Sequence, residues 1–150
     1  MRASRLLIPP VWFALAALAM LALDRALPIA DVLAPPWNRL AILPATAGLG
    51  LALSALACFL RARTPVEPRQ VPRALVAEGP YRLTRNPMYL GLSLWLLALA
   101  VFLGALSPFA VIPVFVALIT RLFICGEERM LEQHFGDDFL AYKARVRRWI

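Results

Sequence analysis

Two adjacent carboxylates, Glu127 and Glu128, lie at the end of an apolar run and have no acidic stretch around them. Ionisable side chains at the edge of an apolar span are costly to keep there, which makes them functional candidates. Helical spacing places Arg121 and Glu128 on one face, two turns apart. A guanidinium can orient a charged substrate, and a carboxylate can exchange a proton with one. Arg121 and Glu128 are therefore our catalytic candidates, although an arginine near the end of a span is also explained by its side chain snorkelling to the membrane surface.

A second polar cluster, residues 79–92 (GPYRLTRNPMYLGL), interrupts the apolar sequence with arginines, tyrosines, prolines and glycines. Asn is a favoured N-cap and Pro is favoured at the first helical position, so Asn86 and Pro87 predict the start of a helix. A helix start also presents N–H groups and a positive dipole end, which suit a carboxylate. Taken alone, the cluster is better explained as a helix start at a membrane surface than as a site.

Long uncharged runs surround both clusters, and the chain is 61% hydrophobic with a mean hydropathy of +0.71. About 20 apolar residues suffice to cross a bilayer as a helix. We therefore predict an all-α integral membrane protein, one domain over residues 1–150, with an amphipathic interfacial helix near its C-terminal end. The first run exceeds the h-region of a signal peptide, so we expect it to be retained. The predicted transmembrane helices are 6–27, 39–60, 88–106 and 108–126.

Arginine and lysine residues alternate between the two sides that these helices define. They gather in the loop 61–87 and the tail 127–150, and the turn between the third and fourth helices has none. The positive-inside rule then puts both termini, the loop and the tail in the cytoplasm. The net charge of +7 thus indicates topology and contact with anionic lipid, with no nucleic-acid partner. The Ala-, Leu- and Arg-rich composition favours a bacterial inner membrane.

Cysteine and histidine usage argues against a metal site. Cys58 and Cys125 fall in apolar spans, there is no CxxC, and His134 is the lone histidine. We expect no bound metal and no disulfide framework. The middles of the spans also lack the polar residues that a transport pathway needs, which disfavours a transporter.

Together, the polar clusters resemble the isoprenylcysteine carboxyl methyltransferase family and the related phospholipid N-methyltransferases. The resemblance covers roughly residues 70–150. It rests on Gly79-x-Tyr81-x-x-x-Arg85-Asn86-Pro87-x-Tyr89-x-Gly91, then Glu127-Glu128-x-x-Leu131 and Phe135-Gly136-x-x-Phe139-x-x-Tyr142. It implies a methyltransferase without a Rossmann sheet that binds S-adenosyl-L-methionine in a cytoplasmic pocket. The methyl acceptor would be a lipid or a lipidated small molecule or peptide within the bilayer.

The same resemblance implies which residues form the cofactor pocket. They are Arg73, Ala74, Leu75, Val76, Tyr81, Arg85, Asn86, Pro87, Met88, Tyr89 and Glu127. The chain departs from the family pattern at Asn86, where His is usual, and at Arg73, where some members have His. It also has Phe123 where members that methylate a prenylcysteine carboxylate carry Arg, and Arg121 is the nearest arginine.

Isoprenylcysteine-type O-methylation of a carboxylate is the activity that the resemblance implies first. The sulfonium methyl is already activated, so catalysis would consist mainly of alignment and desolvation, with Arg121 orienting the acceptor. The first alternative is N-methylation of a phosphatidylethanolamine-type amine, which must lose a proton and would give Glu128 or a tyrosine the role of base. The second is a non-catalytic membrane subunit with a decayed cofactor pocket.

Overall fold

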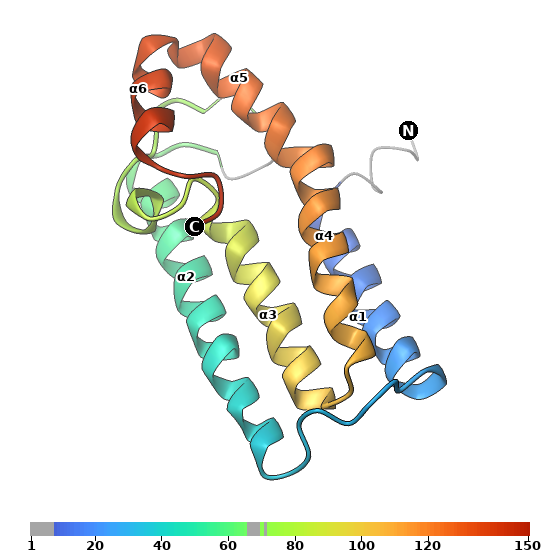
Figure 1. Ribbon diagram of the computed structural model, residues 1–150. Helices are drawn as coiled ribbons and strands as arrows, with labels where there is room; N and C mark the ends of the chain where they lie inside the picture. The colour runs from blue at the N-terminus through green and yellow to red at the C-terminus, as the bar shows by residue number, and fades with distance from the viewer. Residues whose placement is uncertain (1–7, 66–69, 71) are drawn as a thin grey trace.

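The computed structural model describes residues 8–65, 70 and 72–150, and within them the predicted all-α fold is confirmed. Figure 1 shows α1 to α4 as a bundle, with α5 and α6 gathered beyond one end of it. The α-helices are α1 (Pro9–Ala26), α2 (Ile42–Arg61), α3 (Pro87–Leu103), α4 (Val111–Ile119), α5 (Cys125–Phe135) and α6 (Asp137–Arg145). Shorter helical turns are η2 (Trp37–Ala41), η3 (Gly79–Arg82), η4 (Ser107–Ala110) and the π-turn η5 (Thr120–Ile124).

The apolar helices are long enough for a membrane protein. Three continuous helices, Pro9–Ala26, Trp37–Arg61 and Ser107–Phe135, are apolar and long enough to cross a bilayer. α3 is an apolar helix of 17 residues that packs among them. The last helix differs from the sequence-based boundary, because it runs past residue 126 through the π-turn and α5.

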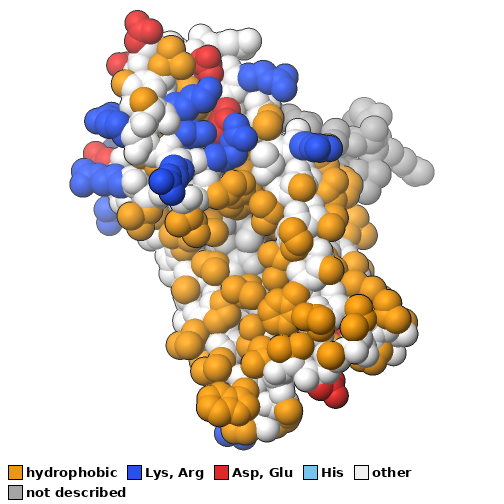
Figure 2. Space-filling model, in the orientation of Figure 1, with side chains coloured by type: hydrophobic (Ala, Val, Ile, Leu, Met, Phe, Trp, Pro, Cys, Tyr) orange, Lys and Arg blue, Asp and Glu red, His pale blue; other side chains and the backbone are white. Residues whose placement is uncertain are grey.

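Hydrophobic and basic side chains separate along the length of the molecule (Figure 2). Hydrophobic side chains cover the body of the bundle, and Lys and Arg gather around α5 and α6. We call the end of the bundle that carries residues 62–65, 70 and 72–86, α5 and α6 the polar end. Leu18, Leu43, Leu53 and Phe102 are all more than half exposed on the bundle, as expected of side chains that face lipid.

The bundle core lies where α1, α3 and α4 meet. Met20, Leu96, Ala100 and Ile119 are each fully buried in one cluster, and Phe115 joins them at 2% exposure. α2 packs on the opposite side of α3, as Figure 1 shows. α3 therefore lies at the centre of the bundle, with α2 on one side and α1 and α4 on the other.

Gly104 ends α3 and explains why the helix stops at Leu103, before the predicted residue 106. Its φ of +84° is left-handed, and an added Cβ would lie 2.6 Å from the carbonyl oxygen of Leu33. The Gly104 carbonyl accepts hydrogen bonds from the amides of Val32 and Leu33 at 2.8 and 3.1 Å. The glycine thus allows the α3–α4 turn to pack against the loop that follows α1.

Glycines also let α2 and α3 approach closely. A Cβ added at Gly48 would lie 2.8 Å from the Gly91 carbonyl oxygen and 2.6 Å from Trp95 Cδ1. At Gly91 the added atom would lie 2.9 Å from the Gly48 carbonyl oxygen. Side chains of ordinary size would therefore separate the two helices.

We expect Gly48→Ala to lower the free energy of unfolding by about 1–3 kcal/mol, because the backbone of α3 must move. Gly50→Ala is the matched control, since an added Cβ there meets nothing within 4 Å. Helix propensity predicts that it raises stability by about 0.5–1 kcal/mol. Thermal unfolding in detergent measures both. Equal melting temperatures for the two variants would contradict the close crossing.

α6 is amphipathic, as the sequence predicts, and its apolar face packs against the protein. Phe139 and Tyr142 are 1% and 4% exposed. With Val146 they form a second core cluster, against which Leu75, Ala77, Leu131 and Phe135 pack. This cluster joins α6 to α5 and to the loop between α2 and α3, so three segments distant in sequence meet at the polar end.

Candidate functional site

A cavity of about 500 Å³ lies where these three segments meet. Most of the residues predicted from the sequence line it: Ala74, Leu75, Val76, Tyr81, Arg85, Asn86, Met88, Tyr89, Glu127 and Glu128. The cavity also extends into the bundle, where Ala52 of α2 and Leu92 of α3 line it, and it reaches Pro9 at the start of α1. It therefore has polar walls near the polar end and apolar walls between the helices.

Three predicted site residues do not line this cavity. Pro87 is fully buried as the first residue of α3, and Arg73 is exposed, with its amide donating to Thr64 Oγ1 at 2.8 Å. Arg121 is exposed on the π-turn. The helical spacing that paired Arg121 with Glu128 assumes an unbroken α-helix. A π-turn adds a residue to one turn and rotates the remainder of the helix by about 100°.

Tyr89 and Glu127 join the two polar clusters of the sequence. The Tyr89 hydroxyl donates to Glu127 Oε1 at 2.8 Å, and both residues line the cavity. The Tyr89 ring lies 6.4 Å from the ring of Phe123, which is 2% exposed. At the position where some family members carry Arg, Phe123 thus packs beside Tyr89. It presents no cation to a substrate.

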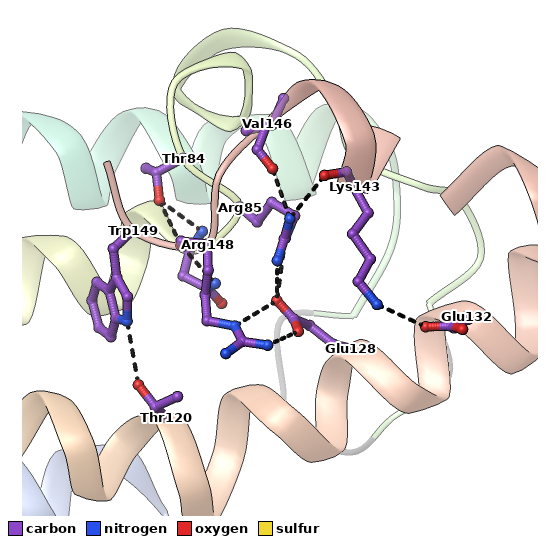
Figure 3. A network of polar contacts seen from close by, with 10 residues as sticks. Thr84, Arg85, Thr120, Glu128, Glu132, Lys143, Val146, Arg148 and Trp149 are labelled. Atoms are coloured by element: carbon purple, nitrogen blue, oxygen red, sulfur yellow. Dashed lines mark hydrogen bonds and ion pairs between the residues drawn. The ribbon is translucent and has the colours of Figure 1, made fainter. Parts of the chain in front are cut away.

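Glu128 binds two arginines (Figure 3). Arg85 donates to Glu128 Oε1 from Nε at 3.1 Å and from Nη2 at 2.8 Å. Arg148 donates to Oε1 from Nε at 3.1 Å and to Oε2 from Nη2 at 2.6 Å. The side chains of Glu128 and Arg85 are 9% and 10% exposed. A carboxylate with both oxygens bonded to guanidinium groups is poorly suited to accept a substrate proton, so this geometry argues against Glu128 as the base.

Arg148 is a functional candidate that the sequence analysis missed. In the sequence it is one of the basic residues of the tail 127–150, which predict topology and contact with anionic lipid. The structure brings it to Glu128 because the chain leaves the helical conformation after α6, at Val146. Only the tertiary path of this segment distinguishes Arg148 from the exposed arginines beside it.

Asn86 is at the N-cap position of α3, but its side chain makes no capping hydrogen bond. The predicted helix start is confirmed, because Asn86 is the N-cap residue and Pro87 begins α3. Asn86 Nδ2 instead donates to the Arg148 carbonyl at 3.0 Å. The same carbonyl accepts from Thr84 Oγ1 at 3.0 Å. The Asn86 side chain is thus engaged by the segment after α6 and does not cap its own helix.

Tyr81 and Tyr142 form the wall of the cavity on the α6 side. The Tyr142 hydroxyl donates to the Tyr81 carbonyl at 2.7 Å, and the Tyr81 ring lies 5.6 Å from the ring of Phe59 in an edge contact. Burial raises the pKa of Tyr81 far above its ordinary value, and burial raises the pKa of Tyr142 to about 12. Both hydroxyls therefore stay protonated at physiological pH.

We expect Tyr142→Phe to lower the free energy of unfolding at pH 8 by about 1–3 kcal/mol, because the buried Tyr81 carbonyl loses its donor. The raised pKa means that folding favours the protonated hydroxyl. Its stabilisation is complete below the ordinary pKa of 10.0 and is lost as pH rises toward about 12. Thermal stability between pH 8 and 12 should fall less steeply in the variant. Parallel pH profiles would refute this role for Tyr142.

The described residues contain no group of three or more His, Cys, Asp or Glu side chains that could hold a metal ion. The cavity instead offers carboxylates, amides, phenols and one guanidinium at its polar end and apolar side chains toward the bundle. This combination suits an organic ligand with several polar groups, together with a molecule that extends into lipid.

Comparison with known proteins assigns the family. The model of the phospholipid methyltransferase family matches residues 39–138, two thirds of the chain. A protein of Haemophilus influenzae, described as an uncharacterized protein, is 41% identical over 63 residues, which are 42% of this chain and 100% of that protein. No solved structure matches the chain. The family match and the apolar helices identify the chain as an integral membrane protein that belongs to the phospholipid methyltransferase family, a family of membrane methyltransferases.

Proposed function

We propose that the chain is a membrane methyltransferase that uses S-adenosyl-L-methionine and acts on a lipid-like acceptor. The observation that carries the proposal is the Tyr89–Glu127 hydrogen bond of 2.8 Å inside the cavity. It joins the two clusters on which the family resemblance rests. The cavity of about 500 Å³ is in the range of cofactor-sized sites, about 300–1,000 Å³.

The cofactor would be held by Glu127, Asn86 and the apolar wall of residues 74–76. The Glu127 carboxylate accepts hydrogen bonds from ammonium or hydroxyl groups, and the Asn86 amide can accept or donate. Ala74, Leu75 and Val76 provide a surface for an adenine ring. When bound, the cofactor supplies an electrophilic methyl group. The residues of the chain align the acceptor with it and exclude water.

An amine acceptor, as in phosphatidylethanolamine-type N-methylation, fits the described residues better than a carboxylate. Among the described residues that line the cavity, Arg85 is the one Lys or Arg, and it already binds Glu128 and the carbonyls of Lys143 and Val146. This part of the chain thus presents no uncommitted Lys or Arg side chain in the cavity to orient a carboxylate. In this proposal the Glu127 carboxylate, which accepts a hydrogen bond from Tyr89, also takes the proton that an amine must lose.

The test is methyl transfer by the purified protein in lipid nanodiscs. Incubation with methyl-labelled S-adenosyl-L-methionine and a bacterial lipid extract should move label into the lipid fraction. An amine acceptor gives a product that resists mild base, whereas an isoprenylcysteine-type ester loses its label as methanol. Binding of the cofactor without transfer to any lipid would contradict the lipid-like acceptor, whereas failure to bind the cofactor would support the non-catalytic alternative with its decayed pocket. The absence of both binding and transfer would overturn the proposal.

The polar end would face the cytoplasm of a bacterial cell, with the bundle in the inner membrane. Basic residues concentrate at this end, as the positive-inside rule requires for a cytoplasmic side. We expect single cysteines at Gln70 and Leu140, which are both exposed, to be labelled from the cytoplasm alone. Cys58 and Cys125 are first replaced by alanine. Labelling of either site from outside would contradict the orientation.

A further inference from the structure

The segment after α6, Val146–Trp149, crosses between the start of α3 and the last long helix (Figure 3). We call it the post-α6 segment. The carbonyls of Val146 and Arg147 accept hydrogen bonds from Arg85 Nη1 at 2.7 Å and from the Arg85 amide at 2.9 Å. Trp149 Nε1 donates to Thr120 Oγ1 at 3.3 Å. The segment is therefore bonded both to the residues that precede α3 and to the helix that carries Glu127 and Glu128.

We propose that the post-α6 segment positions the cofactor-binding residues and that Arg148 is its positioning residue. This inference rests on the proposed function. Arg148 does not line the cavity, so its effect on a ligand must pass through the residues that it holds. Arg148 forms hydrogen bonds with two residues that line the cavity. Its side chain donates to Glu128, and its carbonyl accepts from Asn86.

The first effect of Arg148 is on the carboxylates of α5. Its guanidinium binds both oxygens of Glu128, and such two-point contact fixes orientation as well as distance. Glu127 is the preceding residue of the same helical turn. Holding Glu128 in this orientation holds the turn, and so directs Glu127 toward Tyr89 and the cavity.

The second effect is on the amide of Asn86. A carbonyl accepts hydrogen bonds and donates none, so the Arg148 carbonyl selects the Nδ2 end of the amide. The other end, Oδ1, receives no hydrogen bond from a described residue, and Asn86 lines the cavity. The post-α6 segment thereby presents Asn86 to a ligand as a hydrogen-bond acceptor. A family member with His at this position can present a donor as well.

The experiment measures S-adenosyl-L-methionine affinity by calorimetry in nanodiscs, below the melting temperature of every variant. Arg148→Gln should raise the Kd about tenfold, the effect of losing one charge-assisted hydrogen bond. Arg148→Lys keeps the charge without the planar fork and should give an intermediate Kd. Arg145→Gln is the control. This substitution removes an exposed arginine of α6 whose Nε bonds only to the Ala141 carbonyl among the described residues. The Kd of the Arg145→Gln variant for the cofactor should match that of wild type.

A double-mutant cycle separates positioning from general loss of structure. If Arg148 acts through Glu128, then Glu128→Gln should raise the Kd in the wild-type background and change it much less in the Arg148→Gln background. A purely structural role would lower the melting temperature and leave the Kd of the folded protein unchanged. If Arg148→Gln does not fold, Arg148→Lys takes its place in the cycle.

The outcomes distinguish this inference from the proposed function. A wild-type protein that binds the cofactor, with an Arg148 variant of equal affinity or an additive cycle, overturns the positioning role alone. An equal loss in Arg145→Gln also overturns it, because the effect would then be one of surface charge. A wild-type protein that does not bind the cofactor overturns the proposed function, and the positioning role with it.

Discussion

Glu127→Gln is expected to weaken S-adenosyl-L-methionine binding by about 1.5–3 kcal/mol, the contribution of a hydrogen bond to a charged group. Glu127 lines the cavity and accepts from Tyr89 at 2.8 Å. Glutamine can keep the Tyr89 contact through its own oxygen, so the fold should be retained. Calorimetry on the purified variant measures the loss of affinity, and its melting temperature reports the fold.

Glu132→Gln is the matched control for this substitution. Glu132 lies on the same helix and pairs with Lys143 at 3.1 Å, but its side chain is 44% exposed and it does not line the cavity. The affinity of the Glu132→Gln variant for S-adenosyl-L-methionine should equal that of wild type. Tyr89→Phe should give a smaller loss than Glu127→Gln, because the ring stays against Phe123. Wild-type affinity in a folded Glu127→Gln protein would refute the role of this carboxylate.

Glu128→Leu is expected to lower the free energy of unfolding by about 3–5 kcal/mol. The substitution removes the shared counter-ion of Arg85 and Arg148 and leaves the Arg85 side chain, 10% exposed, without an opposite charge. Two guanidinium groups would then face each other across an apolar side chain. Thermal unfolding in detergent measures the loss.

Glu132→Leu serves as the control for a half-exposed ion pair. Its partner Lys143 is 38% exposed, so the loss should stay below about 1 kcal/mol. If the Glu128 and Glu132 variants lose equal stability, then the Arg85–Glu128–Arg148 network adds nothing beyond an ordinary surface pair. A Glu128 variant as stable as wild type would contradict a stabilising role for this network.

The fold could be predicted from the sequence because membrane helices follow from composition and length. Uncharged runs indicated the helices, and Gly104 and Pro108 marked the α3–α4 turn. Most of the predicted site residues also lie at one cavity, and all of these except Glu128 were named from the family resemblance rather than from spacing. Ten of the predicted residues line one cavity, drawn from the loop, α3 and α5.

The predictions that differ from the structure depended on local conformation or on distant contacts. The π-turn at Thr120–Ile124 breaks the α-helical spacing that placed Arg121 beside Glu128. No residue type in this segment, TRLFI, predicts a π-turn. Asn86 is a favoured N-cap residue, yet its amide bonds to the Arg148 carbonyl, 62 residues away in sequence. Periodicity and capping preferences describe neighbours along the chain, so neither could reveal Arg148.

Photo-crosslinking of labelled S-adenosyl-L-methionine to the purified protein is the most direct test of the central claim, that the cavity at the polar end binds this cofactor. Irradiation should attach label to peptides that contain residues 74–89 or Glu127, and excess S-adenosylhomocysteine should abolish it. The Glu127→Gln variant should label weakly, and Glu132→Gln should label like wild type. Label confined to other peptides, or equal labelling of the two variants, would contradict the assignment of the cofactor to this cavity.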